Sequence, residues 1–164
     1  MSFTIEQDRE QAKRAFSLQS RADIISIRLV DGRISCKVRI EEAQVPLRFA
    51  IRFEPEDAIL SEGQLTATVK FVFKTSDKNT RDALVFRCRI QADYRLMEGF
   101  RPSEEEIEAF NGGNAILNCW PYFREFVQST VTRMHYPPPT IPFLRLVPKR
   151  TGPRAELTED LRGD

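Results

Sequence analysis

The segment from Leu84 to Leu96 alternates more regularly than any other part of the chain. Nearly every residue between its apolar positions is polar or charged, and three of these are arginines. Because successive side chains of a strand point to opposite faces of a sheet, this period of two predicts a long strand with one buried and one wet face. The buried face would carry Leu84, Phe86, Cys88, Ile90, Ala92, Tyr94 and Leu96.

Three earlier segments have the same period. Residues 24–40 predict either a hairpin that turns at Asp31-Gly32 or one long bulged strand. Residues 45–54 and 63–74 each predict one further strand. The connections between these segments are too short for crossover helices, so we expect a four-stranded antiparallel sheet. The inward residues of the second and third strands would be Leu47, Phe49, Ile51 and Phe53, and Ala67, Val69, Phe71 and Phe73.

Two short helices are predicted from capping signals. Thr4 followed by Gln7 has the spacing of a capping box, which favours a helix over residues 4–19. Ser103 followed by Glu106 has the same spacing, and the adjacent glutamates complement the helix dipole. We expect the second helix to end at Gly112-Gly113.

A longer helix is predicted from Asn114 to about Met134, where apolar residues recur at helical spacing. Pro121 lies inside this pattern and costs roughly 3 kcal/mol in a helix interior, so a kink near Trp120 is expected. The prolines of "YPPPTIPF" exclude helix and favour an extended surface loop. Residues 1–148 would form one domain of the α+β class, with the helix covering the sheet. The polar residues 149–164 would form a disordered tail.

These features together resemble the SecB family of export chaperones. The resemblance is carried by Trp120-Pro121-Tyr122-Phe123-Arg124-Glu125, by the helix continuation "FVQSTVTRM", and by the proline-rich loop. It is strongest over residues 110–146, whereas upstream only the order and length of the strands agree.

The resemblance implies an ATP-independent cytoplasmic holdase without cofactor or nucleotide. It implies a homotetramer, a dimer of dimers, that holds unfolded preproteins or an antitoxin in apolar grooves between helix, loop and sheet. The predicted groove residues are Phe49, Phe71, Phe86, Tyr94, Trp120, Phe123, Tyr136, Ile141, Phe143 and Leu144. Positions on the sheet and helix more often belong to a core or subunit interface, so the four loop residues from Tyr136 onward are the stronger candidates.

Two departures from the family bear on the partner. The loop is followed by "PFLRLVPKR" rather than a second long helix. The wet face of the last strand carries Arg87, Arg89 and Arg95, where the export chaperones dock the SecA motor through an acidic surface. Because like charges repel, docking of SecA is not expected, and SecB-like chaperones of toxin–antitoxin systems become a serious alternative.

Other functions have weaker signals. With 25 basic and 24 acidic residues there is no field to attract nucleic acid, and no apolar run is long enough to insert into a membrane. The three separated cysteines and the lone His135 lack the spacing of a zinc site or a catalytic pair, so neither metal nor catalytic residue is predicted. The competing hypotheses are a hot-dog-like enzyme or ligand binder using Asp93 or Glu104 to Glu106, and an inert assembly module.

Overall fold

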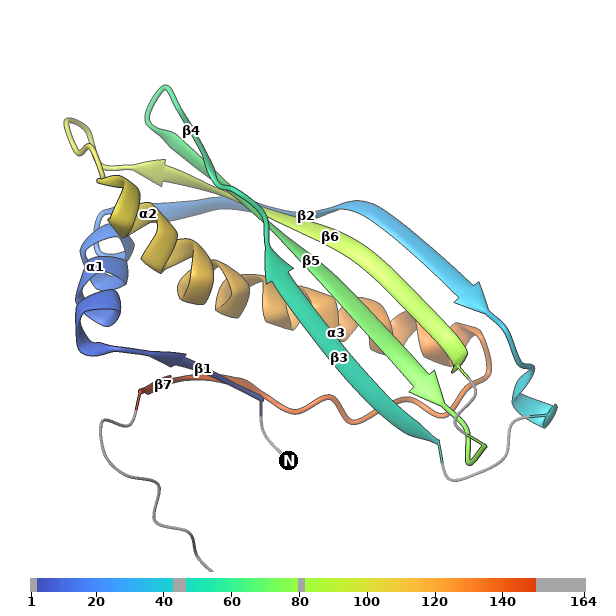
Figure 1. The fold of residues 1–164 in the computed structure, drawn as a ribbon. Helices are drawn as coiled ribbons and strands as arrows, with labels where there is room; N and C mark the ends of the chain where they lie inside the picture. The colour runs from blue at the N-terminus through green and yellow to red at the C-terminus, as the bar shows by residue number, and fades with distance from the viewer. Residues whose placement is uncertain (1–2, 43–46, 80–81, 150–164) are drawn as a thin grey trace, which may run out of the picture.

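The computed structural model describes residues 3–42, 47–79 and 82–149, and its main element is an antiparallel sheet (Figure 1). Its strands β2 (Ala22–Cys36), β3 (Arg48–Pro55), β5 (Gln64–Ser76) and β6 (Asp82–Leu96) lie in the order β2-β6-β5-β3. A short strand, β4 (Ile59–Ser61), also pairs with β5. The predicted four-stranded sheet is therefore confirmed, with β4 as an addition.

Strand β2 settles the alternative left open by the sequence, because it is one long bulged strand. It pairs with β6 from Ala22 to Cys36, and its register shifts near Ile24 and again just after Leu29. The chain passes through Asp31-Gly32 without reversing. The tight turn lies instead between β4 and β5, where Glu62 and Gly63 both have positive φ, as a two-residue hairpin loop requires.

A long helical segment lies across one face of this sheet (Figure 1). It consists of α2 (Glu104–Phe110), a π-helical turn η2 (Asn111–Ala115) and α3 (Ile116–Arg133). Ser103 is the N-cap, and the backbone N–H of Ser103 donates to the Glu106 carboxylate over 2.8 Å, which completes the predicted capping box. Pro121 lies inside α3, and the helix continues on both sides of it.

The prediction that Gly112-Gly113 ends the second helix is wrong, because the chain continues into α3 through the π-helical turn. Gly113 instead allows close packing, because it has no side chain where the Gln7 side chain lies. A Cβ atom at this position would lie 2.3 Å from Nε2 of Gln7, so a larger residue would displace that side chain. The Gln7 amide uses this space to donate to the Ala109 carbonyl oxygen over 3.2 Å. Sequence alone presents the glycines as a stop signal, since their tertiary neighbour is remote in the chain.

The N-terminal region also differs from its prediction. Residues Phe3–Gln7 form a strand, β1, which pairs in parallel with β7 (Leu144–Pro148). The first helix, α1 (Arg9–Gln19), starts later than expected and has Asp8 as its N-cap, with Gln11 completing the capping box. Helix α1 packs against α2 of the same chain. One 3-10 turn, η1 (Ile40–Glu42), completes the described elements, and residues 150–164 of the predicted tail lie outside them.

Aromatic rings fill the space between the sheet and α3. Phe71 on β5 stacks against Phe123 on α3 with ring centroids 4.5 Å apart. Phe86 on β6 meets Phe73 and Phe126 edge-on at 5.9 and 6.1 Å. Offset stacked and edge-to-face arrangements of this kind add to the gain from burial alone. The inward residues of β5 and β6 predicted from the alternation are all buried.

On the opposite face of the sheet, Asp93 is buried by its neighbours. Its carboxylate accepts hydrogen bonds from Ser26 at 2.8 Å, Thr66 at 2.9 Å and Gln91 at 3.0 Å. Burial alone would raise the pKa of this carboxyl, but these three hydrogen bonds and the charge of Arg28 outweigh it and lower the pKa. The charged form is thus stabilised by folding, and Asp93 joins three neighbouring strands.

We predict that Asp93→Ala lowers the free energy of unfolding by about 1–3 kcal/mol at neutral pH, because three donors lose their acceptor. A carboxyl whose pKa is lowered by folding stabilises the protein above its unfolded-state pKa of about 3.8 and loses that contribution as the pH falls through its folded-state pKa. The difference between parent and variant in urea unfolding should therefore shrink from pH 6 to about pH 3. A difference that does not change with pH would contradict this role of the charge.

Candidate functional site

Three side chains of α3 hold the loop that follows this helix against it. Nε1 of Trp120 donates to the Pro142 carbonyl oxygen over 3.0 Å. One turn further along α3, the Arg124 guanidinium lies over the Phe143 ring, 4.6 Å from its centroid. Since residues at i, i+4 and i+8 share one face of a helix, Gln128 lies in the same line, and its amide donates to Pro139. This ladder fixes the course of residues 136–143.

The loop buries some of its large side chains. Tyr136 and Ile141 are buried, as is Leu144 at the start of β7. The Tyr136 hydroxyl donates to the Val38 carbonyl oxygen, and burial is the main cause that raises the pKa of this phenol to about 12. These contacts anchor both ends of the loop. Phe143 is different, because 70% of it is exposed.

Between this loop and the edge strand β3 lies an apolar hollow of about 400 Å³. Phe49, which is 36% exposed, and the buried Thr75 contribute to its wall on the sheet side. The buried Oγ1 of Thr75 has no hydrogen-bond partner among the described residues. The hollow therefore combines an apolar lining with one unused polar atom. Its complete lining is Leu47, Arg48, Phe49, Thr75, Tyr136, Pro137, Pro138, Pro139 and Thr140.

The ten predicted groove residues divide into two groups in the structure. Only Phe49 and Phe143 are exposed, whereas the other eight are buried. A client could reach the buried group only if the core opened. Sequence reasoning missed Leu47 and Thr75, although the three consecutive prolines indicated where the hollow lies. The buried residues are Phe71, Phe86, Tyr94, Trp120, Phe123, Tyr136, Ile141 and Leu144.

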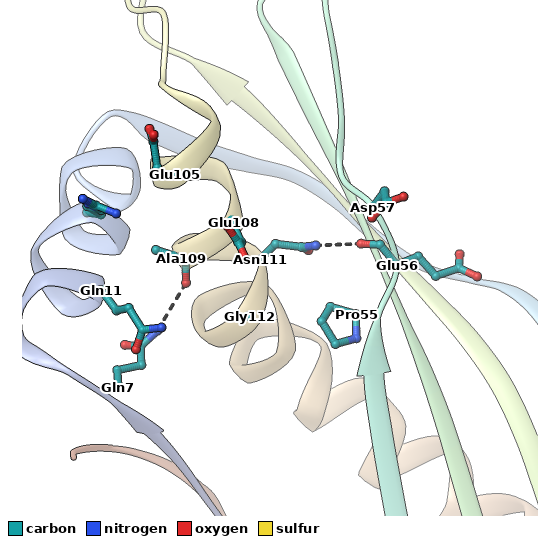
Figure 2. Close-up of a pocket in the computed structure, with 11 residues that line it drawn as sticks. Gln7, Gln11, Pro55, Glu56, Asp57, Glu105, Glu108, Ala109, Asn111 and Gly112 are labelled. Carbon is teal, nitrogen blue, oxygen red and sulfur yellow. Dashed lines mark hydrogen bonds between the residues drawn. The ribbon is translucent and has the colours of Figure 1, made fainter. Parts of the chain in front are cut away.

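A second, polar pocket of about 380 Å³ lies where β1, α1, α2 and the end of β3 meet (Figure 2). Two hydrogen bonds, drawn as dashed lines, hold the segments around this pocket together. Gln7 reaches Ala109, and Nδ2 of Asn111 donates to the Glu56 carbonyl oxygen over 2.6 Å (Figure 2). Both bonds attach remote segments to the region around the π-helical turn, so they position the helix against the sheet.

The groups considered for an enzyme are not gathered at one place. Asp93 is held on the outer face of the sheet, while Glu106 is occupied in the cap of α2. Burial raises the pKa of the Cys88 and Cys119 thiols to about 12, so both remain protonated near neutral pH. A protonated thiol is a poor nucleophile and metal ligand.

No group of side chains in the described ranges comes together in a way that could hold a metal ion. None of the described helices is both long and apolar enough to cross a membrane. At the end of α3, His135 adopts a positive φ, and its backbone N–H donates to Thr132. His135 thus contributes its backbone to the helix end, at a position where glycine or asparagine is more usual.

No protein-family model matches this sequence, and no curated protein matches it. Among solved structures, the chain is similar to the Mycobacterium tuberculosis Rv1957 SecB-like chaperone in complex with a ChAD peptide from the Rv1956 HigA1 antitoxin. The two share 22% identity with a TM-score of 0.74, over 82% of this chain and 99% of that chain. The fold is therefore SecB-like, which confirms the resemblance seen in the sequence at the level of structure.

A second solved structure, a protein of unknown function from Streptococcus agalactiae, shares 13% identity over 74% of this chain and 97% of that chain. Its TM-score is 0.43, which is too low to support a conclusion.

We predict that Trp120→Ala lowers the free energy of unfolding by about 3–5 kcal/mol, because it leaves a cavity and releases the Pro142 carbonyl group. The control is Phe143→Ala, which removes an exposed ring from the same loop and should change stability by less than about 1 kcal/mol. Chemical denaturation followed by circular dichroism measures both. Equal stability of Trp120→Ala and the parent protein would contradict the anchoring role of the indole.

Proposed function

We propose that this protein is a chaperone that binds nonnative polypeptide and acts as a holdase without ATP. The observation that carries the proposal is the apolar hollow between the proline-rich loop and β3, in a fold that is SecB-like. Binding and release need no reacting group. The tethered loop supports this function, because a surface that is already ordered loses less entropy when it binds.

Client segments bind to the exposed aromatic rings and to the hollow. Phe49 and Phe143 lie outside the core, and each apolar side chain buried there contributes roughly 1.5–3 kcal/mol. A few shallow contacts of this size hold a flexible chain without reading its sequence closely. Strand β3 is an edge of the described sheet, so an extended client can also pair with its backbone.

The client class is proposed from the comparison. The Rv1957 structure contains a ChAD peptide from an antitoxin, so a peptide of an antitoxin is the first client to test for this chain. Export of preproteins is the second. The exposed arginines Arg87, Arg89 and Arg95 on β6 do not favour docking of SecA through this face, because it lacks the acidic surface that such docking uses.

A homo-oligomer, in the form of a dimer of dimers, is part of the proposal. Strand β2 is the other edge of the described sheet, and several of its large aliphatic side chains are exposed. An exposed apolar edge strand readily pairs with another chain, and pairing with a second copy would cover it. The exposed side chains are Ile24, Ile25, Leu29, Val30 and Ile34.

We predict that Phe49→Asp and Phe143→Asp each weaken client binding by about tenfold, because a charge replaces an apolar contact worth more than about 1.4 kcal/mol. The measurement is suppression of light scattering when a chemically unfolded polypeptide is diluted into buffer without nucleotide. Tyr136→Asp does not serve as a test, because Tyr136 is buried and its loss would disturb the fold.

The matched control is Ile59→Asp, which places the same charge at the β4 hairpin, away from the loop, at a residue about as exposed as Phe143. It should suppress aggregation as well as the parent protein does. If Phe49→Asp and Phe143→Asp both retain full activity, neither the hollow nor the exposed Phe143 ring is the client site. If the parent protein suppresses no aggregation and binds no antitoxin peptide, the chaperone function itself is wrong.

We also predict that Leu29→Asp combined with Ile34→Asp dissociates the oligomer, because two charges would have to be buried at the β2 edge. Sedimentation velocity at several protein concentrations measures the mass. The control is Ile59→Asp combined with Leu60→Asp, which should leave the mass unchanged. A parent protein that is monomeric at all concentrations would disprove this part of the proposal.

A further inference from the structure

The outer face of the sheet, turned away from α3, carries a row of three arginines defined by strand register. Arg33 on β2 lies directly opposite Arg87 on β6. Arg87 is in turn opposite Val72 on β5, and Val72 is opposite Arg52 on β3. Directly opposed residues point to the same face, so Arg33, Arg87 and Arg52 form one line, here called the arginine row. All three are exposed.

The charges of the arginine row are not compensated within the described part of the chain. Nearby cations are paired: Glu56 binds Arg89 at 2.6 Å and Lys70 at 3.1 Å, and Asp82 binds Lys74 at 3.2 Å. Among the described residues, no ion pair involves a member of the row. Like charges directly opposite each other on neighbouring strands destabilise a sheet, so the Arg33 and Arg87 pair has a cost without a structural benefit.

We propose that the arginine row is the docking site for a short acidic polypeptide segment. Neighbouring strands are about 4.8 Å apart, so the row spans about 14 Å from β2 to β3. An extended peptide places every second side chain on one side at a spacing of about 6.8 Å, so three alternating carboxylates span nearly the same distance. Guanidinium groups bind carboxylates through paired hydrogen bonds, which makes arginine the suitable cation.

The shape of the surface around the row agrees with this ligand. A hollow of about 330 Å³ opens beside Arg33 and Arg87, with Val72 among its lining residues. It offers room for an apolar side chain of the peptide between its carboxylates. The face is opposite the side covered by α3, so an acidic partner and a held client can bind together.

A peptide fits this surface better than a nucleic acid. In the next row along the strands, Asp31 and Glu54 stand at the two ends, and they would repel a long phosphate backbone that extends past the arginines. The outward residues paired across the four strands include no aromatic side chain on which a base could stack. On this side of the arginine row, negative charges therefore stand at both edges of the sheet.

The test is fluorescence anisotropy with the full chain and a labelled peptide in which glutamate alternates with serine. A peptide with glutamine in place of glutamate and a labelled single-stranded oligonucleotide are the comparison ligands. Arg33→Gln combined with Arg87→Gln should weaken binding of the acidic peptide about tenfold. Raising the salt concentration should also weaken it, because these charges are exposed.

The matched control is Arg101→Gln combined with Arg133→Gln, which removes the same charge from exposed positions elsewhere and should change affinity less than twofold. The melting temperature of the row variant should not fall, since the substitution relieves repulsion. If it does fall, Arg52→Gln alone provides the test, because Arg52 is not directly opposed by another arginine.

The proposal is wrong if the parent protein does not bind the acidic peptide, or if the row variants bind it with unchanged affinity. It is also wrong if the parent protein binds the oligonucleotide more tightly than the acidic peptide, or if the row variants have a different oligomeric mass from the parent protein. The last would identify a second copy of the chain as the occupant. Because no client is present in this assay, its failure would leave the proposed holdase function untouched.

Discussion

The position of the Trp120 side chain connects the parts of this structure that are furthest apart in sequence. The centroid of its ring lies 5.4 Å from that of Phe3 on β1, 5.8 Å from that of Phe53 on β3 and 6.1 Å from that of Phe71 on β5. Its N–H group binds the loop at Pro142. A buried indole needs a partner for this donor, so the apolar core and the course of the loop are fixed by the same residue. The hollow beside β3 depends on this arrangement, because the loop forms one of its walls.

The proposed functions use different faces of the sheet: clients bind beside the inner face, and the acidic segment binds on the outer face. Helix α3 and the aromatic core cover the inner face over β5 and β6, and the proposed client hollow lies at the β3 edge. The outer face is polar, and Glu56, Asp82 and Asp93 pair with several of its cations, whereas no ion pair among the described residues involves the arginine row. A sheet whose strands alternate strictly can keep these surfaces independent, since a substitution on one face does not change the side chains of the other.

The sequence was sufficient to predict the elements that depend on local pattern. Alternation identified β3, β5 and β6, and the capping box of Ser103 located the start of α2. The errors concern residues whose partners are distant. The pattern at Gly113 predicts a helix stop, although this glycine makes room for Gln7. The pattern of residues 4–7 predicts a helix, although these residues pair with β7. Local propensity contains no information on such contacts.

The candidate site was predicted less completely than the fold. The proline-rich loop has no helix, as its prolines predict, but the prediction that its large side chains lie on the surface is wrong for Tyr136 and Ile141, which are buried. The distinction depends on the ladder from Trp120 to Gln128, which draws the loop inward. A helical pattern shows which residues share a face, but it does not show whether that face meets the sheet or the loop.

The parallel pairing of β1 with β7 has a consequence for synthesis on the ribosome. Phe3 emerges near the beginning of translation, but its partner Leu144 emerges only after the whole sheet and α3 have been made. Contacts so distant in sequence form late and slow the last stage of folding. Strand β1 therefore waits unpaired while the rest of the domain assembles. A nascent chain interrupted before Leu144 would have its sheet, its long helix and the tethered loop, but β1 would have no partner strand.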